Sequence, residues 1–490
     1  MEGKVYLVGA GPGDEGLITL KGLKAIQQAD VILYDRLINP KLLESAPSHC
    51  EFIFCGKLPK KHLLKQELIT EILVQKALEG STVVRLKGGD PGVFGRVGEE
   101  AEALVSYDIP FEIVPGITSG IAASLYAGIP VTHREYGVSF AMITAHDKTK
   151  DGKPTIDFAG LVNSVDTVAF YMGIANISYI SENLVCYGKP AETPVILIQW
   201  GTYGRQKTLQ GTLADISDKV KAAKFTNPAI ALVGDIVSLR EKLKWFEKKP
   251  LHGKQILLTR TGTGESAIAE TLKEQGADVI EFPKWVKKDV PINEGIINKL
   301  YLYDRILFTA TESINDFFDL LSAKRIDVRN ITAQFYVMSK KSLLVLNKRG
   351  LTGLEEEKME RHGKLLIIGN RRNPSNLVQY GRHDFLQTSE ICLDEKFMPV
   401  IRQMLDEAVI DTILFPSSYS VDVLIENANF INLNIVGFLK ETQKYCMGQK
   451  TRKRMEEYGF QPDFMASEPT IDKLISALTG KAEKVRAVEV

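Results

Sequence analysis

The chain has 490 residues, too many for one hydrophobic core, and this length predicts about two to four domains. Lys plus Arg and Asp plus Glu both total 61, so no overall charge attracts the protein to nucleic acid or to an anionic membrane. Apolar residues make up 44% and charged residues 25% of the chain, as in soluble globular proteins.

The first residues enter a strand directly, without the long apolar segment of a signal peptide or anchor. No segment reaches the roughly 18 uninterrupted apolar residues that a membrane-spanning helix needs. We therefore expect a cytoplasmic protein that is not embedded in a membrane.

The cysteines are odd in number and form no CxxC pair, which favours reduced thiols: Cys50, Cys55, Cys186, Cys392 and Cys446. His49, Cys50, Cys55 and His62 could be considered as a metal cluster. Their spacing matches no standard zinc site, so no metal is predicted.

Short apolar strands alternate with amphipathic helices along most of the chain, which predicts an α/β fold. The expected elements are a strand at 4–8, a helix at 17–28, strands at 31–34 and 111–114, a helix at 65–78 and a strand at 229–233. The strand at 111–114 ends at Pro115-Gly116, a typical break.

Residues 238–254 combine a charged helix end with Pro250 and Gly253, which predicts a linker. We expect a domain at 1–245 with subdomains of about 1–135 and 136–245, a linker at 246–253 and a second domain at 254–490. Within that second domain, Asp304-Arg-Ile-Leu-Phe recurs 107 residues later as Asp411-Thr-Ile-Leu-Phe, and Lys254-Gln-Ile-Leu-Leu returns after 110 residues as Lys364-Leu-Leu-Ile-Ile. The near-equal offsets predict two similar α/β lobes.

The stretch Val83–Glu100, VVRLKGGDPGVFGRVGEE, leads from a buried strand into a loop with four glycines. Gly88 and Gly89 permit close backbone approaches that a Cβ would forbid, and ligands of α/β sheets bind at such strand ends. An ordinary Gly-Pro turn is the alternative that these residues alone leave open.

A second loop, Gly9-Ala-Gly-Pro-Gly13, follows the first strand, and Asp30 comes 21 residues after Gly9, so a dinucleotide site has to be considered. The fingerprint fails because its third glycine falls at Asp14, and because Pro12 removes an amide that could have donated to a phosphate. A loop poor in donors and rich in acids suits a cationic ligand such as S-adenosylmethionine. A nicotinamide-dependent oxidoreductase stays possible only if this failure is discounted.

Several motifs occur in a recognisable order: GAGPGDEGLITLKG (9–22), ADVILYDRLIN (29–39), GK (56–57), the 83–100 loop, VPGITSGIAASLYAGIPVTHR (114–134), FYMG (170–173) and NPAIALVGDIV (227–237). Residues 1 to about 245 resemble uroporphyrinogen-III C-methyltransferase in these motifs. The resemblance implies two α/β subdomains with S-adenosylmethionine bound between them, the conversion of uroporphyrinogen III to precorrin-2 by two methylations, and a homodimer.

Cofactor contacts carried over by motif position are Pro12, Gly88, Gly89, Asp90, Val93, Thr118, Ser119, Met172 and Gly201. Taken singly, Met172 could equally pack in the core, and Thr118 could only cap a helix.

The resemblance assigns proton handling to Asp35 as acceptor and Lys57 as donor. Methyl transfer from a sulfonium needs mainly alignment, so removal of a proton is the step that needs a base. The alternatives are a strand-end Asp35 paired with Arg36, and Lys57 on a solvated basic face.

The substrate of this family carries eight carboxylates, which arginine side chains bind well. The arginines in the matched motifs are Arg36, Arg85, Arg96 and Arg134. We expect some of them to bind substrate carboxylates.

Residues from about 251 to 490 resemble uroporphyrinogen-III synthase, which closes hydroxymethylbilane with inversion of its last ring. The matching motifs include KQILLTR (254–260), DRILFTATESINDFF (304–318), DTILFPSSYSVDVL (411–424) and GQKTRKRMEEYG (448–459). By position, the candidate substrate-binding residues are Thr309, Ser313, Ser417, Ser418 and Thr451. Each could instead cap a helix or a strand end.

Two departures concern this second resemblance. A GxxT-like turn appears as Met338-Ser-Lys-Lys-Ser342 without its glycine, and Leu386 stands where a tyrosine is often found. The sequence thus leaves two interpretations of the C-terminal half. It is a fused synthase, which makes the chain a two-step enzyme, or it is a non-catalytic tetrapyrrole-binding domain attached to a methyltransferase.

Overall fold

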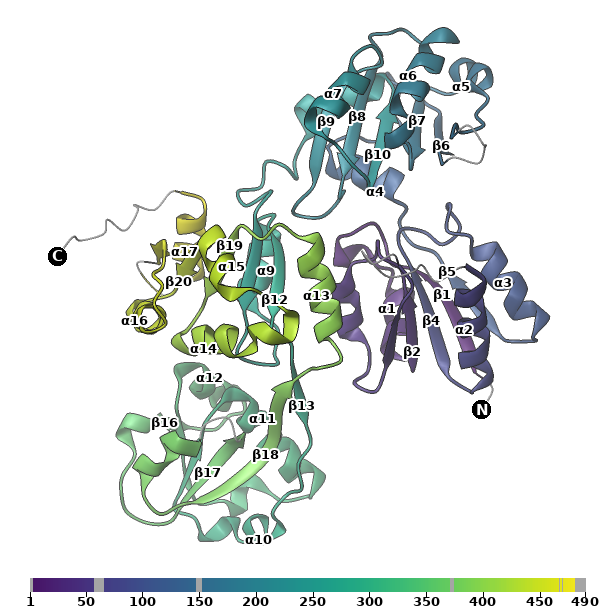
Figure 1. The fold of residues 1–490 in the computed structure, drawn as a ribbon. Helices are drawn as coiled ribbons and strands as arrows, with labels where there is room; N and C mark the ends of the chain where they lie inside the picture. Colours follow the sequence, from purple (N-terminus) through teal and green to yellow (C-terminus); the bar gives the residue numbers. More distant parts are fainter. Residues whose placement is uncertain are drawn as a thin grey trace, which may run out of the picture.

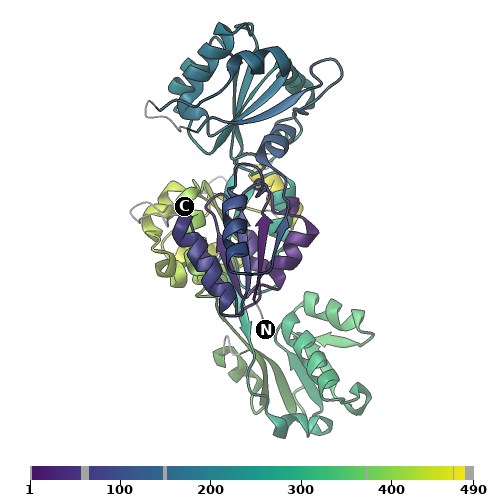
Figure 2. The same ribbon diagram turned by 90° about the vertical axis from the view of Figure 1, so that its right-hand side faces the viewer.

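The computed structural model describes residues 3–56, 66–146, 152–370, 374–466, 468 and 470–480. These residues form four β-sheets flanked by helices, and we call each sheet with its helices a unit, numbered in chain order (Figure 1). In the view turned by 90°, the second unit lies at the top, the fourth at the bottom, and the first and third lie between them (Figure 2). The predicted α/β class is confirmed.

The first unit is a fully parallel sheet. Its order is β3 (Glu51–Phe54), β2 (Val31–Tyr34), β4 (Thr82–Lys87), β1 (Lys4–Gly9) and β5 (Phe111–Val114). Helices α1 (Leu20–Gln27), α2 (Gln66–Leu78) and α3 (Val97–Ser106) connect these strands. The helix predicted at 17–28 begins later, at Leu20, because the Thr19 side chain caps it by accepting from the Gly22 N–H.

The second unit is a mixed sheet in the order β6 (Phe140–Thr144), β7 (Thr167–Tyr171), β10 (Ala229–Val233), β8 (Pro194–Gln199) and β9 (Lys207–Thr212). Helix α4 (Ser119–Tyr126) leads into it from the first unit. The connection predicted as a linker at 246–253 buries Phe246 and Leu251, so it packs against its neighbours. The predicted domain boundaries themselves stay a prediction.

The third and fourth units repeat one topology. The third has the order β12 (Asp278–Phe282), β11 (Gln255–Thr259), β19 (Thr412–Phe415), β20 (Gln443–Cys446) and β21 (Phe464–Met465). The fourth has β18 (Asp384–Leu393), β17 (Leu365–Asn370), β14 (Arg305–Phe308), β15 (Gln334–Val337) and β16 (Gly353–Glu355) in the same places, with β13 (Trp285–Lys288) added at the edge. The predicted duplication is confirmed by this strand order.

Equivalent aspartates show the same repeat at the level of side chains. The Asp411 carboxylate accepts from the Gln255 N–H at 2.8 Å, and the Asp304 carboxylate accepts from the Lys364 N–H at 2.7 Å. Each bond ties the start of one central strand to its neighbour, and this explains why both aspartates stand just before an ILF strand.

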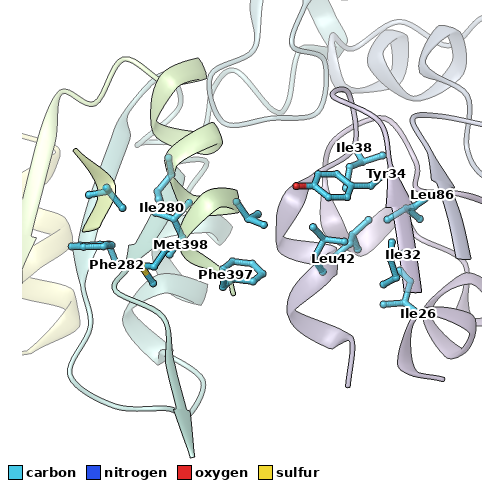
Figure 3. Packing of buried hydrophobic residues seen from close by; sticks show 14 of the residues in the cluster. Ile26, Ile32, Tyr34, Ile38, Leu42, Leu86, Ile280, Phe282, Phe397 and Met398 are labelled. Carbon is cyan, nitrogen blue, oxygen red and sulfur yellow. The ribbon is translucent and has the colours of Figure 1, made fainter. Parts of the chain in front are cut away.

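The first and third units share one apolar core. Ile38 and Leu42 of the first unit belong to the same buried cluster as Ile280, Phe397 and Met398 of the third (Figure 3). Helix α13 (Met398–Glu407) runs beside the first unit (Figure 1). Burial of apolar surface therefore holds the two halves of the chain together.

Among the described residues, no helix is both long and apolar enough to cross a bilayer.

Candidate active site

Three loops at the carboxyl ends of β1, β4 and β5 meet backbone to backbone. Gly11 and Gly89 exchange two hydrogen bonds, with N···O distances of 3.1 and 2.8 Å. A Cβ on Gly116 would lie 2.3 Å from the Gly89 carbonyl oxygen, and a Cβ on Gly9 would lie 2.6 Å from the Gly116 nitrogen. The glycines that marked this region in the sequence are thus required by close approach.

The Asp90 carboxylate fixes the long glycine loop. It accepts from the Gly92 N–H at 2.7 Å and from the Gly116 N–H at 2.9 Å, while the Val93 N–H donates to the Asp90 carbonyl. The structure therefore brings together five predicted cofactor residues, Pro12, Gly88, Gly89, Asp90 and Val93. Their contact with a cofactor stays a prediction.

Tyr171, at the end of β7, joins the second unit to these loops. Its hydroxyl lies 2.7 Å from the Thr118 Oγ1 and accepts from the Gly120 N–H at 2.6 Å, and its ring lies 5.0 Å from that of Phe94. Thr118 is the N-cap residue of α4, immediately before Ser119, yet its side chain makes no capping bond to the helix. Its hydroxyl instead connects the two units.

Met172 and Gly201 lie in two further loops of the second unit. Met172 is 44% exposed and has a φ of 56°, so the alternative that it packs in the core is wrong. Gly201 lies between two non-glycine residues with positive φ, Trp200 and Thr202, and a Cβ on it would lie 2.3 Å from that of Ala123. The Thr202 hydroxyl accepts from the Asp14 N–H at 2.8 Å, which ties this loop to the one that follows β1.

Backbone strain is concentrated in these loops. Nine non-glycine residues of the described chain have positive φ, and five of them lie here: Phe94, Arg96, Met172, Trp200 and Thr202. Such conformations cost about 1–3 kcal/mol each and gather at ligand-binding and catalytic sites. The strain marks the loops around the two units as a candidate active site.

Asp35, the predicted proton acceptor, is paired with a buried arginine. Its Oδ1 lies 2.5 Å from Nη2 of Arg85, which is 2% exposed. The Arg85 Nε also lies 3.1 Å from Glu100, and the Lys87 Nζ lies 2.9 Å from the same carboxylate. Asp35 is held in place by this cluster but is itself partly exposed. Lys57 lies outside the described residues.

Burial and charge act in opposite directions on Glu100. Burial alone raises the pKa of Glu100, but Arg85 and Lys87 outweigh it, so the pKa of this carboxyl is lowered overall. Burial, together with repulsion from Arg85, lowers the pKa of the Lys87 ammonium. This cluster was not predicted from the sequence, although Glu100 lies four residues before the buried Leu104 on the inner face of α3.

The four candidate arginines have different surroundings. Arg85 is enclosed by Asp35 and Glu100, Arg36 is paired with Glu407 of α13 at 2.8 Å, and Arg96 is paired with the neighbouring Glu99. Arg134 is exposed. The enclosed position of Arg85 favours a supporting role for that residue, and substrate binding by each of the four stays a prediction.

The candidate residues of the C-terminal half follow the carboxyl ends of β14, β19 and β20. Ser313 and Thr451 are 2% exposed, and their hydroxyls donate to the Ala310 and Met447 carbonyls. Ser417 caps α14 (Ser418–Asn427) by accepting from the Ser420 N–H, and the Thr309 hydroxyl donates to the Ile368 carbonyl. Each of these four side chains thus has a capping or strand-end bond, and a role toward a substrate stays a prediction.

The glycine missing from the Met338–Ser342 turn has a simple substitute. Ser339 caps α12 (Lys340–Lys348) by accepting from the Ser342 N–H at 3.1 Å. In the equivalent turn of the third unit, Gly448 has a φ of 97° and makes no side-chain cap. The departure therefore leaves the local fold intact.

Comparison with known proteins agrees with both resemblances. A uroporphyrinogen-III C-methyltransferase of Bacillus subtilis (strain 168) is 48% identical over 460 residues, which is 94% of this chain and 94% of that protein. The chain belongs to this family of methyltransferases.

A second relative covers nearly all of the chain. The porphyrin biosynthesis protein HemD of Ruminiclostridium josui is 34% identical over 511 aligned positions, covering 97% of each chain. A solved structure of uroporphyrin-III C-methyl transferase from Thermus thermophilus, complexed with S-adenyl homocysteine, is 34% identical with a TM-score of 0.42, and covers 48% of this chain and 99% of its own.

Two family models match separate parts of the chain. The model for tetrapyrrole (corrin/porphyrin) methylases matches residues 4–217, and the one for uroporphyrinogen-III synthase HemD matches residues 388–490. The first range contains every candidate cofactor residue. The second contains Ser417, Ser418 and Thr451, whereas Thr309 and Ser313 lie outside it.

Proposed function

We propose that this chain is a bifunctional enzyme of tetrapyrrole biosynthesis. Residues 1–245 methylate two ring carbons of uroporphyrinogen III to give precorrin-2, with S-adenosylmethionine as methyl donor. Residues 254–490 cyclise hydroxymethylbilane to uroporphyrinogen III, and 246–253 join the two parts. The 48% identity to a uroporphyrinogen-III C-methyltransferase over 94% of both chains carries the methylation, and the match of residues 388–490 to the uroporphyrinogen-III synthase HemD model supports the cyclisation.

The residues present suit a cationic cofactor better than a phosphate. The N–H groups of Gly11 and Gly89 each donate to the carbonyl oxygen of the other residue, Pro12 has no amide hydrogen, and Asp14 and Asp90 add negative charge. Gly88, Gly89 and Asp90 on one side and Met172 and Gly201 on the other would hold S-adenosylmethionine. When bound, it supplies an electrophilic methyl group.

The protein's own contribution is to align the substrate and to accept a proton. The Asp35 carboxylate, held 2.5 Å from Arg85, stabilises positive charge that develops on the methylated tetrapyrrole and accepts the proton that is then lost. The ion pair with Arg85 fixes the position of the Asp35 carboxylate. Lys57 is proposed as the proton donor.

The cyclisation half acts mainly by folding a linear tetrapyrrole so that its ends meet. Hydroxyls and backbone amides at the carboxyl ends of β14, β19 and β20 are proposed to hold substrate carboxylates through Thr309, Ser313, Ser417, Ser418 and Thr451. Loss of water from hydroxymethylbilane needs little further assistance. The alternative function, a methyltransferase with a non-catalytic tetrapyrrole-binding domain, predicts the same fold without cyclisation.

Product analysis tests the proposal. The purified chain is given hydroxymethylbilane anaerobically, with and without S-adenosylmethionine, and the tetrapyrroles are separated after oxidation. We expect the type III isomer without the methyl donor and a dimethylated product with it. Formation of the type I isomer alone would contradict the cyclisation activity and favour the alternative.

An Asp35→Asn variant separates the two activities. Methylation should fall at least about 100-fold, the usual range for loss of a general base, while cyclisation is unchanged because Asp35 lies in the first unit. Undiminished methylation would remove Asp35 from the mechanism.

Assembly and location complete the proposal. The family resemblance supports a cytoplasmic homodimer formed through the methyltransferase half. Light scattering on the purified protein should then give twice the 54.5 kDa mass of the chain, and a monomer mass would contradict dimerisation.

A further inference from the structure

Arg205 connects a loop of the methyltransferase to the C-terminal half of the chain. Arg205 follows the loop at 200–204 that contains Gly201. Its Nη1 donates to the Glu407 carbonyl oxygen at 3.1 Å, and its Nε lies 3.3 Å from the Asp278 carboxylate. Both partners belong to the third unit, so a residue of the cofactor loop is held from outside the methyltransferase.

The same arginine supports the strained part of the loop. Its guanidinium lies 4.1 Å from the centre of the Trp200 ring and 5.1 Å from that of Tyr203. Trp200 and Thr202 both have positive φ, a conformation that persists only where the surroundings impose it. A cation over an aromatic ring, anchored at its far side, is such a constraint.

The backbone of the loop also touches the third unit. A Cβ on Gly204 would lie 2.3 Å from the Asp278 nitrogen, and the Gly204 carbonyl accepts from the Gly253 N–H at 2.8 Å. Beside these contacts a cavity of about 130 Å³ separates the units, and its walls include Asp14, Thr202 and Arg205. Because this part of the boundary is not fully packed, the loop depends more on the direct contacts of Arg205 for its position.

The acceptors of Arg205 are well suited to a cation. Glu407 is the last residue of α13, where the carbonyl groups lack partners within the helix and the helix dipole is negative. The side chain of Glu407 meanwhile pairs with Arg36, next to Asp35. The end of α13 therefore contacts both the loop of the proposed base and the loop of the proposed cofactor site.

We infer that the third unit positions the cofactor loop of the methyltransferase, with Asp278 and the Glu407 carbonyl as positioning groups that act through Arg205. The inference rests on the proposed function, since it concerns the affinity of that site for S-adenosylmethionine. Among the contacts described above, Asp278 touches no candidate site residue, and Glu407 touches only Arg36.

The apolar core shared by the first and third units makes the inference testable by single substitutions. Ile38 and Leu42 lie in the same buried cluster as Phe397 and Met398 (Figure 3), and the Phe52 ring lies 6.2 Å from the Phe397 ring, so apolar contacts also join the two units. In an Asp278→Ala variant the third unit should therefore stay packed against the first, and only the contact with Arg205 should be lost. Asp278 lies at the amino end of β12, whereas the candidate cyclisation residues follow the carboxyl ends of strands, so cyclisation reports whether the C-terminal half is folded.

Calorimetric titration of the full-length chain with S-adenosylmethionine provides the test. Asp278→Ala and Arg205→Ala should each raise the dissociation constant about threefold to tenfold, the range typical of coupled contacts. The double variant should bind no more than about twofold more weakly than Arg205→Ala alone, because both substitutions remove the same contact. Asp278→Asn serves in place of Asp278→Ala if cyclisation shows that the alanine variant is misfolded.

Glu294→Gln is the matched control, since it removes a carboxylate paired with Lys324 at 2.6 Å in the fourth unit, and its affinity should equal that of the unmodified chain. Affinity within twofold of the unmodified chain in a folded Asp278 variant would overturn the positioning role while leaving the proposed function intact. Failure of the unmodified chain to bind S-adenosylmethionine would instead overturn the proposed function and, with it, this inference.

Discussion

Arg85 connects Asp35 to Glu100: one buried guanidinium lies 2.5 Å from the first carboxylate and 3.1 Å from the second. Glu100 is fully buried, whereas Asp35 is partly exposed at the end of β2. The orientation of the proposed base is thus determined by a charge cluster beneath the active-site surface. This arrangement makes Arg85 a structural support of the site and gives it a measurable effect on stability.

Replacing Arg85 by Met should destabilise the first unit by about 3–5 kcal/mol, because removal of one partner leaves buried charge without compensation. Methylation should fall as well, since Asp35 loses its fixed partner. Hydrogen exchange of the β4 amides measures the stability of this unit separately from the rest of the chain. Arg329→Met, which breaks the exposed pair with Asp327, should leave exchange unchanged. An equal response of the two variants would contradict the role of Arg85.

Glu100 should make the first unit sensitive to acid. The pKa of Glu100 is raised by burial but lowered overall by Arg85 and Lys87. Because the folded-state pKa lies below the unfolded value of about 4.3, the stabilisation is complete above that pH and is lost as pH falls through the folded pKa. Between pH 7 and pH 5, Glu100→Gln should therefore be less stable than the unmodified chain by a constant amount.

Urea unfolding of the first unit at a series of pH values measures this difference. The gap between Glu100→Gln and the unmodified chain should close below about pH 4.3. A gap that stays constant down to pH 3 would show that the ionised carboxylate is not the source of the stabilisation.

Gly116 permits the contact among the three loops, so Gly116→Ala should weaken S-adenosylmethionine binding by about tenfold or more. The new Cβ would lie 2.3 Å from the Gly89 carbonyl oxygen, and a packed backbone cannot absorb such an overlap without moving. Gly98→Ala is the matched control. A Cβ there meets nothing within 4 Å, and alanine should stabilise α3 by about 0.5–1 kcal/mol. Equal binding by both variants would contradict the loop contact.

Much of the fold follows from local sequence patterns. Four of the five strands of the first unit, the glycines at their ends and the repeat of Asp304 and Asp411 could be predicted, because strand ends and repeats are local or periodic signals. The start of α1 at Leu20 was not predicted, because the helical pattern of apolar residues already begins before Thr19. The cap formed by Thr19 sets the start of the helix instead. Apolar periodicity alone does not show which polar residue ends a helix.

The supports of the site could not be predicted in the same way. Arg36 and Glu407 are 371 residues apart, and no local pattern relates them. In the sequence, Tyr171 is only an aromatic residue of a strand, and nothing there indicates that its hydroxyl joins two units. Such contacts depend on how units that are distant in the sequence pack together, and a single sequence holds little information about that packing.

The duplicated lobes allow one stabilising substitution to be predicted. In the third unit Ser417 caps α14 and accepts from the Ser420 N–H at 3.2 Å. In the equivalent position of the fourth unit, Ala310 precedes α11 (Thr311–Ala323) with nearly the same backbone, φ −152° against −153°, but offers no side-chain acceptor. The hydroxyl of Ser313 bonds the Ala310 backbone, as that of Ser420 bonds the Ser417 backbone.

Ala310→Ser should therefore complete the cap and stabilise the fourth unit by about 1 kcal/mol, whereas Ser417→Ala should destabilise the third by a similar amount. Hydrogen exchange of the β14 and β19 amides assigns each change to its own unit. Destabilisation by Ala310→Ser would show that the two helix starts are not equivalent despite their matching backbones. Methylation should be unaffected by Ala310→Ser, because the fourth unit contributes none of the candidate residues of the methyltransferase site.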